Sequence, residues 1–490
     1  MKLFFIFLLL SHPLFAANKA QLDKAPMEWL ISQTLLLKTQ ELAEDFEQDK
    51  LFKQIFETIN YDPDSDEIIL HSSDKMNALK FELIDYLEAK SATKSSDYLF
   101  EIWQQEAPAP YPVKLTENIS PADGFYVFNH VHTDISQDNQ SLKWLKLSPQ
   151  KTFSIIEDFL TKRNTSGVVH FCDHDTDESF DLVSAIPSSN LVPLRSIEWG
   201  GKTHMNLIDI KENWSLIDQG RKYSGEESVI MSRSSEGFRI INHPNGRDPV
   251  FPYTTWLDAD GVEVWNTVLE NSPYQAISKL RGSNNRQAFQ QWVDSLKIGK
   301  RHTAMAGSDF HFIIPCLRDR TLLYPANYIP GDDSSNARAN LFNGNVSFLT
   351  GPTAPKLNLK AKLSKSSSWA QMGSSLEGKG NLQVSVEVDL RDTDTLLKSA
   401  CYNTINAFFN VLTFWKKRRW EIRFYNLAGE VLAKKELNAR KLDHDESFSA
   451  SINIPISGRE IVRAELWEIN KKSKSVDLLS ATNPIYLNWD

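Results

Sequence analysis

The histidines of this chain gather between positions 130 and 311, and most of them follow a short apolar run. His130 and His132 are separated by one residue, and Asp309 and His311 repeat that spacing with a carboxylate. Side chains two apart on a strand point to the same face, so each pair can reach one metal ion. The pattern therefore predicts a metal site built from imidazole and carboxylate groups.

Further motifs add ligands of the same chemical type. Asp173 and His174 are neighbours that point apart if the strand continues, so we expect His174 to bind metal. Asp173 would then orient a ligand or take a proton. Glu198 and His243 each end an apolar run, and His204 follows Glu198 by six residues. Mixed imidazole and carboxylate ligands suit Zn, Mn or Fe(II), and the lack of clustered cysteines argues against a structural zinc site.

Short apolar runs that alternate with helical patterns must position these residues. The helical pattern covers 148–164, and the predicted strands are 125–130, 167–172, 191–199, 205–210, 237–243, 261–266 and 303–309. Seven strands with intervening helices indicate an α/β barrel or a doubly wound sheet. In both folds, functional residues gather at the C-terminal ends of the strands.

The order of the motifs resembles the PHP family, named for polymerase and histidinol phosphatase. The resemblance covers roughly residues 120–355, through HVHTDISQD (130–138), CDHDT (172–176), IEWGGKTHMN (197–206), INHPN (241–245), VEVWN (262–266) and GSDFH (307–311). It implies a distorted seven-stranded (β/α)7 barrel with two to three divalent ions, Zn, Mn or Fe. The later segments RTLLYPAN, NLFNGNVSFLTGP and NPIYLNW are similar to an exported branch of PHP metallohydrolases. That branch includes carbamate hydrolases of the carbaryl-degrading type.

The resemblance also implies a ligand set in which three ions have neighbouring sites. The first ion would take His130, His132, Glu198 and Asp309; Glu198 would bridge to the second, with His204 and His243; and the third would take Asp138, His174 and His311. Many members read HTxxSD, whereas Asp138 comes one place later here, as it does in some members.

Several other polar residues near these motifs have two interpretations. Arg247 can grip an anionic substrate such as a phosphate, or it is a surface arginine. Glu263 is expected to orient a ligand, and Asn266 to do the same or to cap a turn. Three further residues are expected to pack in the core: His170, Cys172 and His302.

The regions that flank residues 111–355 have different patterns. Residues 1–17 begin with Met1-Lys2, continue with an apolar run over 3–10 and end at two alanines, which predicts a signal peptide and a periplasmic or secreted protein. Residues 18–110 show helical periodicity, typical of a packing layer or a surface for a protein partner. Residues 356–490 alternate like the strands of an all-β sandwich.

Charge and hydropathy narrow the classes of partner. The net charge is −9 and there is no long basic block, which argues against nucleic acid as the main partner. The apolar run near the start is shorter than the ~20 residues that span a bilayer, and no later segment is longer, so we expect no stable membrane anchor.

These observations predict an exported, metal-dependent hydrolase of a small-molecule or phosphoester substrate. Two ions about 3.5–4 Å apart can ionise a shared water near neutral pH, which favours a phosphoesterase that uses a metal-bridging hydroxide. A carbamate, amide or ester hydrolase on the same site is the alternative. A non-catalytic surface protein that binds a glycan or a protein partner is the third interpretation, and the full ligand set argues against it.

Overall fold

The computed structural model describes most of the chain beyond residue 109 and parts of the segment before it. The described residues are 27, 30–31, 34–35, 50–62, 67–70, 75–91, 109–136, 146–199, 204–210, 229–230, 232–244, 258–266, 285–313, 318–331, 334–391, 419–437, 447–470 and 475–489. The predicted signal peptide and two predicted site residues, Asp138 and Arg247, lie outside them. Among the described residues, no helix has the length and apolar character needed to cross a membrane.

The predicted ligands that the structure describes lie on or beside two groups of strands. The first group, one half of the site, is three parallel strands joined by helical crossovers. The elements are β4 (Gly124–Val131), α7 (Pro149–Thr161), β5 (Ser166–Phe171), α8 (Glu178–Val183) and β6 (Leu191–Leu194). β4 and β5 are apolar and buried along nearly their whole length, as expected of parallel strands covered on both faces. Ser148 begins α7 by accepting a hydrogen bond from the backbone of Lys151, and Phe153 and Ile156 of this helix are buried in the core.

The other half of the site is a five-stranded mixed sheet. Its elements are β7 (Ser196–Trp199), β8 (Met205–Ile208), β9 (Phe238–Ile241), β10 (Gly261–Asn266), α11 (Asn285–Lys297) and β11 (Thr303–Gly307). β7, β8 and β9 pair antiparallel, whereas β9, β10 and β11 pair parallel. A short 3-10 turn, η5 (Arg233–Ser235), precedes β9.

The expected (β/α)7 barrel is therefore wrong, although each predicted run does form a strand. The run 191–199 divides at Arg195 into β6 and β7, which belong to different sheets. Antiparallel pairing of β7, β8 and β9 replaces the parallel crossovers that a barrel needs. On the far side of β4 lie β12 (Ala326–Pro330) and β13 (Ser347–Leu349), both antiparallel to their neighbours.

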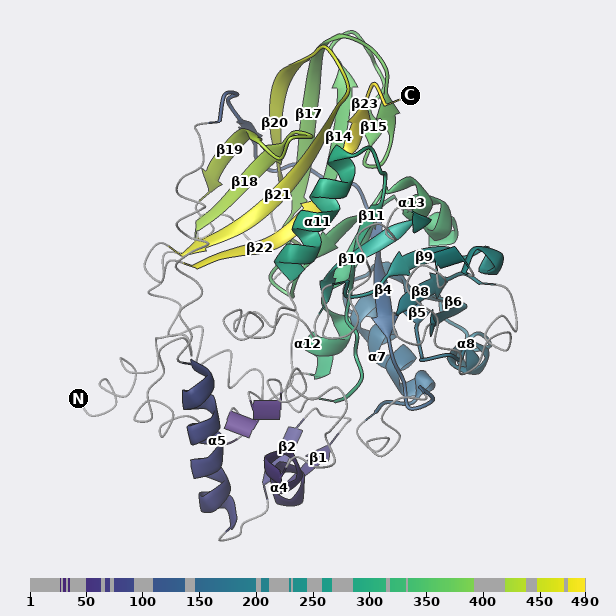
Figure 1. Cartoon of the computed structure of the whole chain (residues 1–490), viewed down its shortest axis with the longest axis vertical. Helices are drawn as coiled ribbons and strands as arrows, with labels where there is room; N and C mark the ends of the chain where they lie inside the picture. The colour runs from purple at the N-terminus through teal and green to yellow at the C-terminus, as the bar shows by residue number, and fades with distance from the viewer. Residues whose placement is uncertain are drawn as a thin grey trace, which may run out of the picture.

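The C-terminal strands are stacked as two layers at one end of the molecule (Figure 1), and one of these layers continues the sheet of β4, β5 and β6. One layer contains β3 (Lys114–Thr116), β14 (Lys356–Leu363), β15 (Ala370–Gln371), β17 (Gly380–Asp389) and β20 (Ser447–Ile456). The other contains β16 (Ser375–Leu376), β18 (Arg419–Tyr425), β19 (Val431–Leu437), β21 (Glu460–Asn470), β22 (Ser475–Thr482) and β23 (Ile485–Leu487). β13 pairs with β22 and β3 pairs with β20, so hydrogen bonding crosses the expected boundary near 355.

Three shorter elements complete the part of the fold after residue 109 that the structure describes. They are α12 (Arg318–Leu323), η8 (Ser334–Asn336) and α13 (Ala337–Asn343). The described N-terminal part contains α4 (Lys50–Thr58) and α5 (Lys75–Ser91), as the helical periodicity predicts. It also contains an antiparallel pair that was not expected, β1 (Ile59–Asp62) with β2 (Glu67–Leu70).

Candidate metal centre

The strands of the two half-sites meet at their C-terminal ends. Isolated parallel bridges join Val131 to Phe310 and His174 to Glu198. The backbone N–H of His132 donates to the carbonyl of Phe310 at 3.0 Å. The ends of β4 and β11, and of β5 and β7, are thereby held together without a closed barrel, and the predicted ligands lie at these junctions.

The backbone at this junction is strained. His130, Asp309 and His243 have φ angles of 62°, 49° and 25°, and Asp175 has 53°. Residues with a β-carbon rarely adopt this region, and each such residue costs about 1–3 kcal/mol unless its surroundings hold it. Strain of this kind concentrates at functional sites, and here three of the four residues are predicted ligands.

Glu198 lies at the centre of the cluster and has an imidazole nitrogen near each side of its carboxylate. Its Oε1 is 3.2 Å from His130 Nε2, 3.2 Å from His204 Nδ1 and 3.3 Å from His243 Nε2. Its Oε2 is 3.3 Å from His132 Nε2 and 3.2 Å from His174 Nε2. This one carboxylate therefore contacts five imidazoles from both halves of the site.

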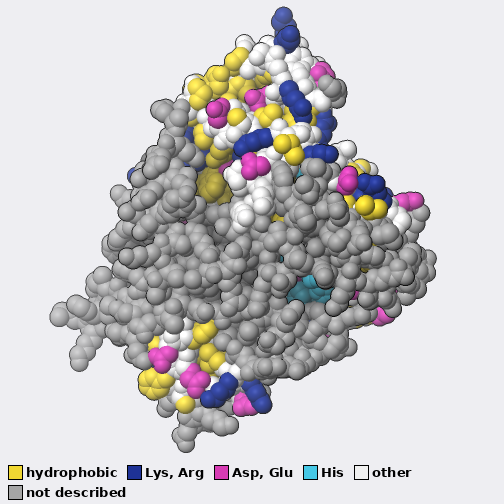
Figure 2. Space-filling model, viewed as in Figure 1, with side chains coloured by type: hydrophobic (Ala, Val, Ile, Leu, Met, Phe, Trp, Pro, Cys, Tyr) yellow, Lys and Arg dark blue, Asp and Glu magenta, His cyan; other side chains and the backbone are white. Residues whose placement is uncertain are grey.

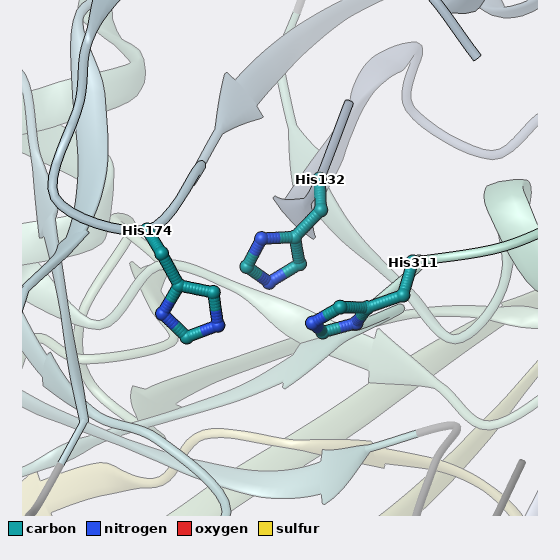
Figure 3. A group of neighbouring side chains, drawn as sticks. All are labelled: His132, His174 and His311. Carbon is teal, nitrogen blue, oxygen red and sulfur yellow. The ribbon is translucent and has the colours of Figure 1, made fainter. Parts of the chain in front are cut away.

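Asp309 forms a second, smaller centre. Its Oδ1 is 3.2 Å from His130 Nε2, 3.3 Å from His132 Nε2 and 3.2 Å from His311 Nδ1. The rings of His132, His174 and His311 come from different segments and lie around one point (Figure 3). The structure thus brings together every predicted metal ligand that it describes; Asp138 alone lies outside the described residues.

Three groups of these residues have ligand atoms within 4.8 Å of one another: His130, His132, Glu198 and Asp309; His174, Glu198 and His204; and His132, His174 and His311. The first is the set that the resemblance implies for the first ion. In the second, His174 stands where His243 was expected, although His243 also contacts Glu198. The chain therefore has a buried His/Glu/Asp group that can hold a metal ion.

The unsatisfied atoms of the cluster fit a metal ion. Among the described residues, His130 Nε2, His132 Nε2, Glu198 Oε2 and Asp309 Oδ1 are buried without a hydrogen-bond partner. Buried polar atoms are nearly always satisfied, because desolvation without a partner is unfavourable. Four such atoms converging from two imidazoles and two carboxylates suit a borderline cation such as Zn, Mn or Fe(II).

Carboxylates and imidazoles shift one another's pKa values in the cluster, and burial acts against these shifts. Burial alone would raise the pKa of Glu198, but His174, His130 and His204 hold it well below its usual value. Burial alone would lower the pKa of His130, but the nearby carboxylates, Asp309 first, hold it well above its usual value. Metal ions bind neutral imidazoles, so metal binding competes with protons at His130 and His243, whose pKa values are raised.

Asp173 lies behind the ligands. Its Oδ1 accepts a hydrogen bond from the backbone N–H of Thr133 at 2.6 Å, and its Oδ2 accepts one from the Thr133 hydroxyl at 2.9 Å and one from the Ser179 hydroxyl. Burial raises the pKa of this carboxyl. Asp173 therefore fixes the backbone directly after His132, and its proton-transfer role stays a prediction.

Two residues at the site carry roles that the sequence did not indicate. Asn242 Nδ2 donates to Glu198 Oε1 at 2.8 Å and to Asn206 Oδ1 at 2.7 Å. Ser136 Oγ accepts from the backbone N–H of His174 at 3.0 Å and lies 3.3 Å from His132 Nδ1. Both belong to motifs that contain ligands, but the contacts of Ser136 with His174 and of Asn242 with Glu198 join segments remote in sequence, and spacing does not encode them.

The three residues expected to pack in the core are all buried. Burial lowers the pKa of His170 to about 3 and raises the pKa of the Cys172 thiol. His302 Nδ1 lies 3.1 Å from the Ser295 hydroxyl of α11. Their burial agrees with the expected packing role.

No protein-family model matches this chain, and no curated protein matches it. The geometry of the site therefore has to support any functional assignment.

Proposed function

We propose that this protein is an exported, metal-dependent hydrolase that binds two to three divalent ions and acts first of all on phosphoesters. The observation that supports this most strongly is the position of Glu198 between imidazoles on both of its oxygens. A carboxylate placed in this way has the geometry to bridge two cations. When bound, two adjacent divalent ions lower the pKa of a shared water towards neutrality and stabilise charge on the attacked centre.

The protein's own residues would divide the work of holding the ions and admitting the substrate. His130, His132 and Glu198 are fully or almost fully buried and would form the floor of the site. His174, His204, His243 and His311 are partly exposed. Histidine side chains are visible at the molecular surface in the view of Figure 2. A substrate would therefore approach from the side of the partly exposed histidines.

Asn242 and Asp173 would keep this geometry during turnover. The amide of Asn242 donates to Glu198 Oε1, so it fixes the rotation of the carboxylate while leaving Oε2 to the opposite imidazoles. Asp173 holds the backbone of Thr133, next to His132. Ligands held from behind in this way bind metal more tightly and in one arrangement.

A substrate panel tests the proposal. The full chain, purified and loaded with Zn²⁺, Mn²⁺ or Fe²⁺, should hydrolyse p-nitrophenyl phosphate and lose that activity with a chelator. Naphthyl carbamate in the same assay distinguishes the alternative substrate class on the same site. A metal-loaded protein that hydrolyses neither compound, nor a wider set of esters and amides, would contradict the hydrolase assignment.

A further inference from the structure

Glu263, on β10, contacts the cluster from outside the ligand set. It is buried, with 1% of its surface exposed. Its Oε1 lies 2.9 Å from His130 Nδ1. Its Oε2 accepts hydrogen bonds from the backbone N–H of His243 at 2.9 Å and from Asn266 Nδ2 at 2.8 Å. One carboxylate therefore contacts groups from three different segments.

Two partners of this carboxylate require an acceptor at Oε2. The backbone of His243 and the amide nitrogen of Asn266 can only donate. If His130 Nδ1 also donates to the carboxylate, the lone pair of His130 lies on Nε2, the atom that points at Glu198 and Asp309. The carboxylate thus selects the imidazole tautomer that can bind a metal ion.

Two of the contacts connect Glu263 to predicted ligands other than His130. Its hydrogen bond to the backbone N–H of His243 stabilises that residue in its strained conformation, with φ at 25°. Asn266 Nδ2 also donates to Asp309 Oδ2 at 3.1 Å, so Asn266 connects Glu263 to a second carboxylate. Asn285 fixes Asn266 in turn, because its side chain bonds both the backbone N–H and the carbonyl of that residue at 3.1 and 3.0 Å.

Gly307, the last residue of β11, has no side chain, and the Glu263 carboxylate occupies the space beside it. A Cβ atom on Gly307 would lie 1.8 Å from Glu263 Oε1 and 2.8 Å from His130 Cβ. Neither distance is compatible with van der Waals contact, so a side chain here would displace Glu263 or His130. Glycine is required at position 307 because Glu263 and His130 approach its backbone so closely. Of these two residues, Glu263 is the one that orients the ring of His130.

We infer that Glu263 is a positioning residue that sets His130, His243 and, through Asn266, Asp309 for metal binding, and that Gly307 provides its space. The inference rests on the metal-binding part of the proposed function and not on the reaction. A glutamine would place its amide N–H either against the two donors at the Oε2 position or against His130 Nδ1, where it favours the tautomer whose lone pair lies on Nδ1 instead of Nε2. The variant would keep the shape of the side chain and lose the orientation of the ligands.

The test is the affinity of the full chain for Zn²⁺, measured by competition with a chromophoric chelator. Glu263→Gln should bind Zn²⁺ about 10–100-fold more weakly than the unaltered protein, the range found for partners behind metal ligands. Gly307→Ala should weaken binding in the same direction. The matched control is Glu387→Gln, a buried glutamate of β17 that bonds Asn358 and Lys360, and its affinity should be unchanged.

Circular dichroism and thermal melting of the metal-free proteins separate positioning from unfolding. If Glu263→Gln does not fold, Asn266→Ala decides, because it leaves the carboxylate and removes the connection to Asp309; it should weaken Zn²⁺ binding several-fold. A folded Glu263→Gln variant that binds Zn²⁺ like the unaltered protein overturns the inference. If the protein and its variants bind Zn²⁺ as expected but hydrolyse nothing, the proposed function fails and the inference stands. A protein that binds no Zn²⁺ overturns both.

Discussion

Two buried carboxylates, Asp389 in the C-terminal strands and Glu198 in the candidate metal centre, are stabilised in different ways. Asp389 is 3% exposed and has its own cations: Lys356 Nζ lies 3.0 Å from Oδ2, and Arg391 donates to both oxygens at 3.0 Å. Burial would raise the pKa of Asp389, but Arg391 and Lys356 hold it below its usual value. Asp389 is therefore stabilised by the folded chain itself.

Glu198 has a pKa lowered in the same direction, but no lysine or arginine among the described residues pairs with it. Its partners are imidazoles, which are cations only when protonated. A buried carboxylate that pairs with lysine or arginine therefore indicates a structural ion pair. A buried carboxylate whose partners are imidazoles indicates a binding site, because its positive charge has to come from a proton or a bound ion.

The largest expected effect follows from removing the charge of Glu198. Glu198→Gln should lower hydrolysis by about 10³-fold or more, because a neutral amide bridges two cations poorly and several kcal/mol of transition-state stabilisation depend on them. Bound metal should fall as well. Steady-state rates and elemental analysis of the variant measure both effects. Near-normal turnover in this variant would remove Glu198 from the centre of the site.

The opposite outcome is expected at the other carboxylate. Asp389→Asn should destabilise the fold by about 3–5 kcal/mol, because it removes the negative charge that the buried Lys356 faces at 3.0 Å. The number of bound metal ions should not change. Denaturant unfolding and elemental analysis are the two measurements. Loss of metal in this variant would mean that the two regions are coupled and that the contrast between them is false.

The difference in unfolding free energy between the unaltered protein and Asp389→Asn should also depend on pH. The pKa of Asp389 is lower in the folded protein than its ordinary value, so its contribution to stability is present above the unfolded pKa of about 3.9 and is lost as pH falls through the folded value. The difference in unfolding free energy between the unaltered protein and Asp389→Asn should be constant above about pH 5 and shrink below about pH 4. A difference that grows on acidification would contradict the assignment of the shift.

The smallest effect is expected from the amide that orients Glu198. Asn242→Ala removes one hydrogen bond to Oε1 and leaves all imidazoles in place. Metal affinity should fall about tenfold, at the lower end of the range for residues behind ligands. Chelator competition at fixed pH gives the value. A loss as large as that of Glu198→Gln would show that Asn242 is part of the primary ligand set.

Most of the strands and most of the described site could be predicted from the sequence, whereas the fold class could not. Periodicity places a strand before His130, before His174 and before His243, and the structure has one at each position. Periodicity does not determine which strands pair, so the change of sheet at Arg195 and the antiparallel β7–β8 pair had no local signal. The alternating strand and helix runs and the resemblance both led to the barrel expectation, which failed at this point.

The hydrogen bonds that orient the ligands could not be predicted from the spacing of residues in the sequence. Glu263 and Asn266 could be named as orienting residues because they lie in a motif at a strand end. The partners of Glu263 are remote in sequence: its bond to His130 spans 133 residues and its bond to the His243 backbone spans 20. Such contacts depend on how β10 lies between β9 and β11. Ligand types are encoded locally, and ligand orientation is encoded by the tertiary fold.

The central claim is that the imidazoles around Glu198 and Asp309 are ligands rather than a network of charged pairs. Elemental analysis of the full chain, purified without added chelator and dialysed against metal-free buffer, tests it directly. Two to three equivalents of Zn, Mn or Fe per chain are expected, and Glu198→Gln measured beside it should retain fewer. A folded protein that retains no divalent metal, and takes up none when Zn²⁺, Mn²⁺ or Fe²⁺ is supplied, would contradict the claim.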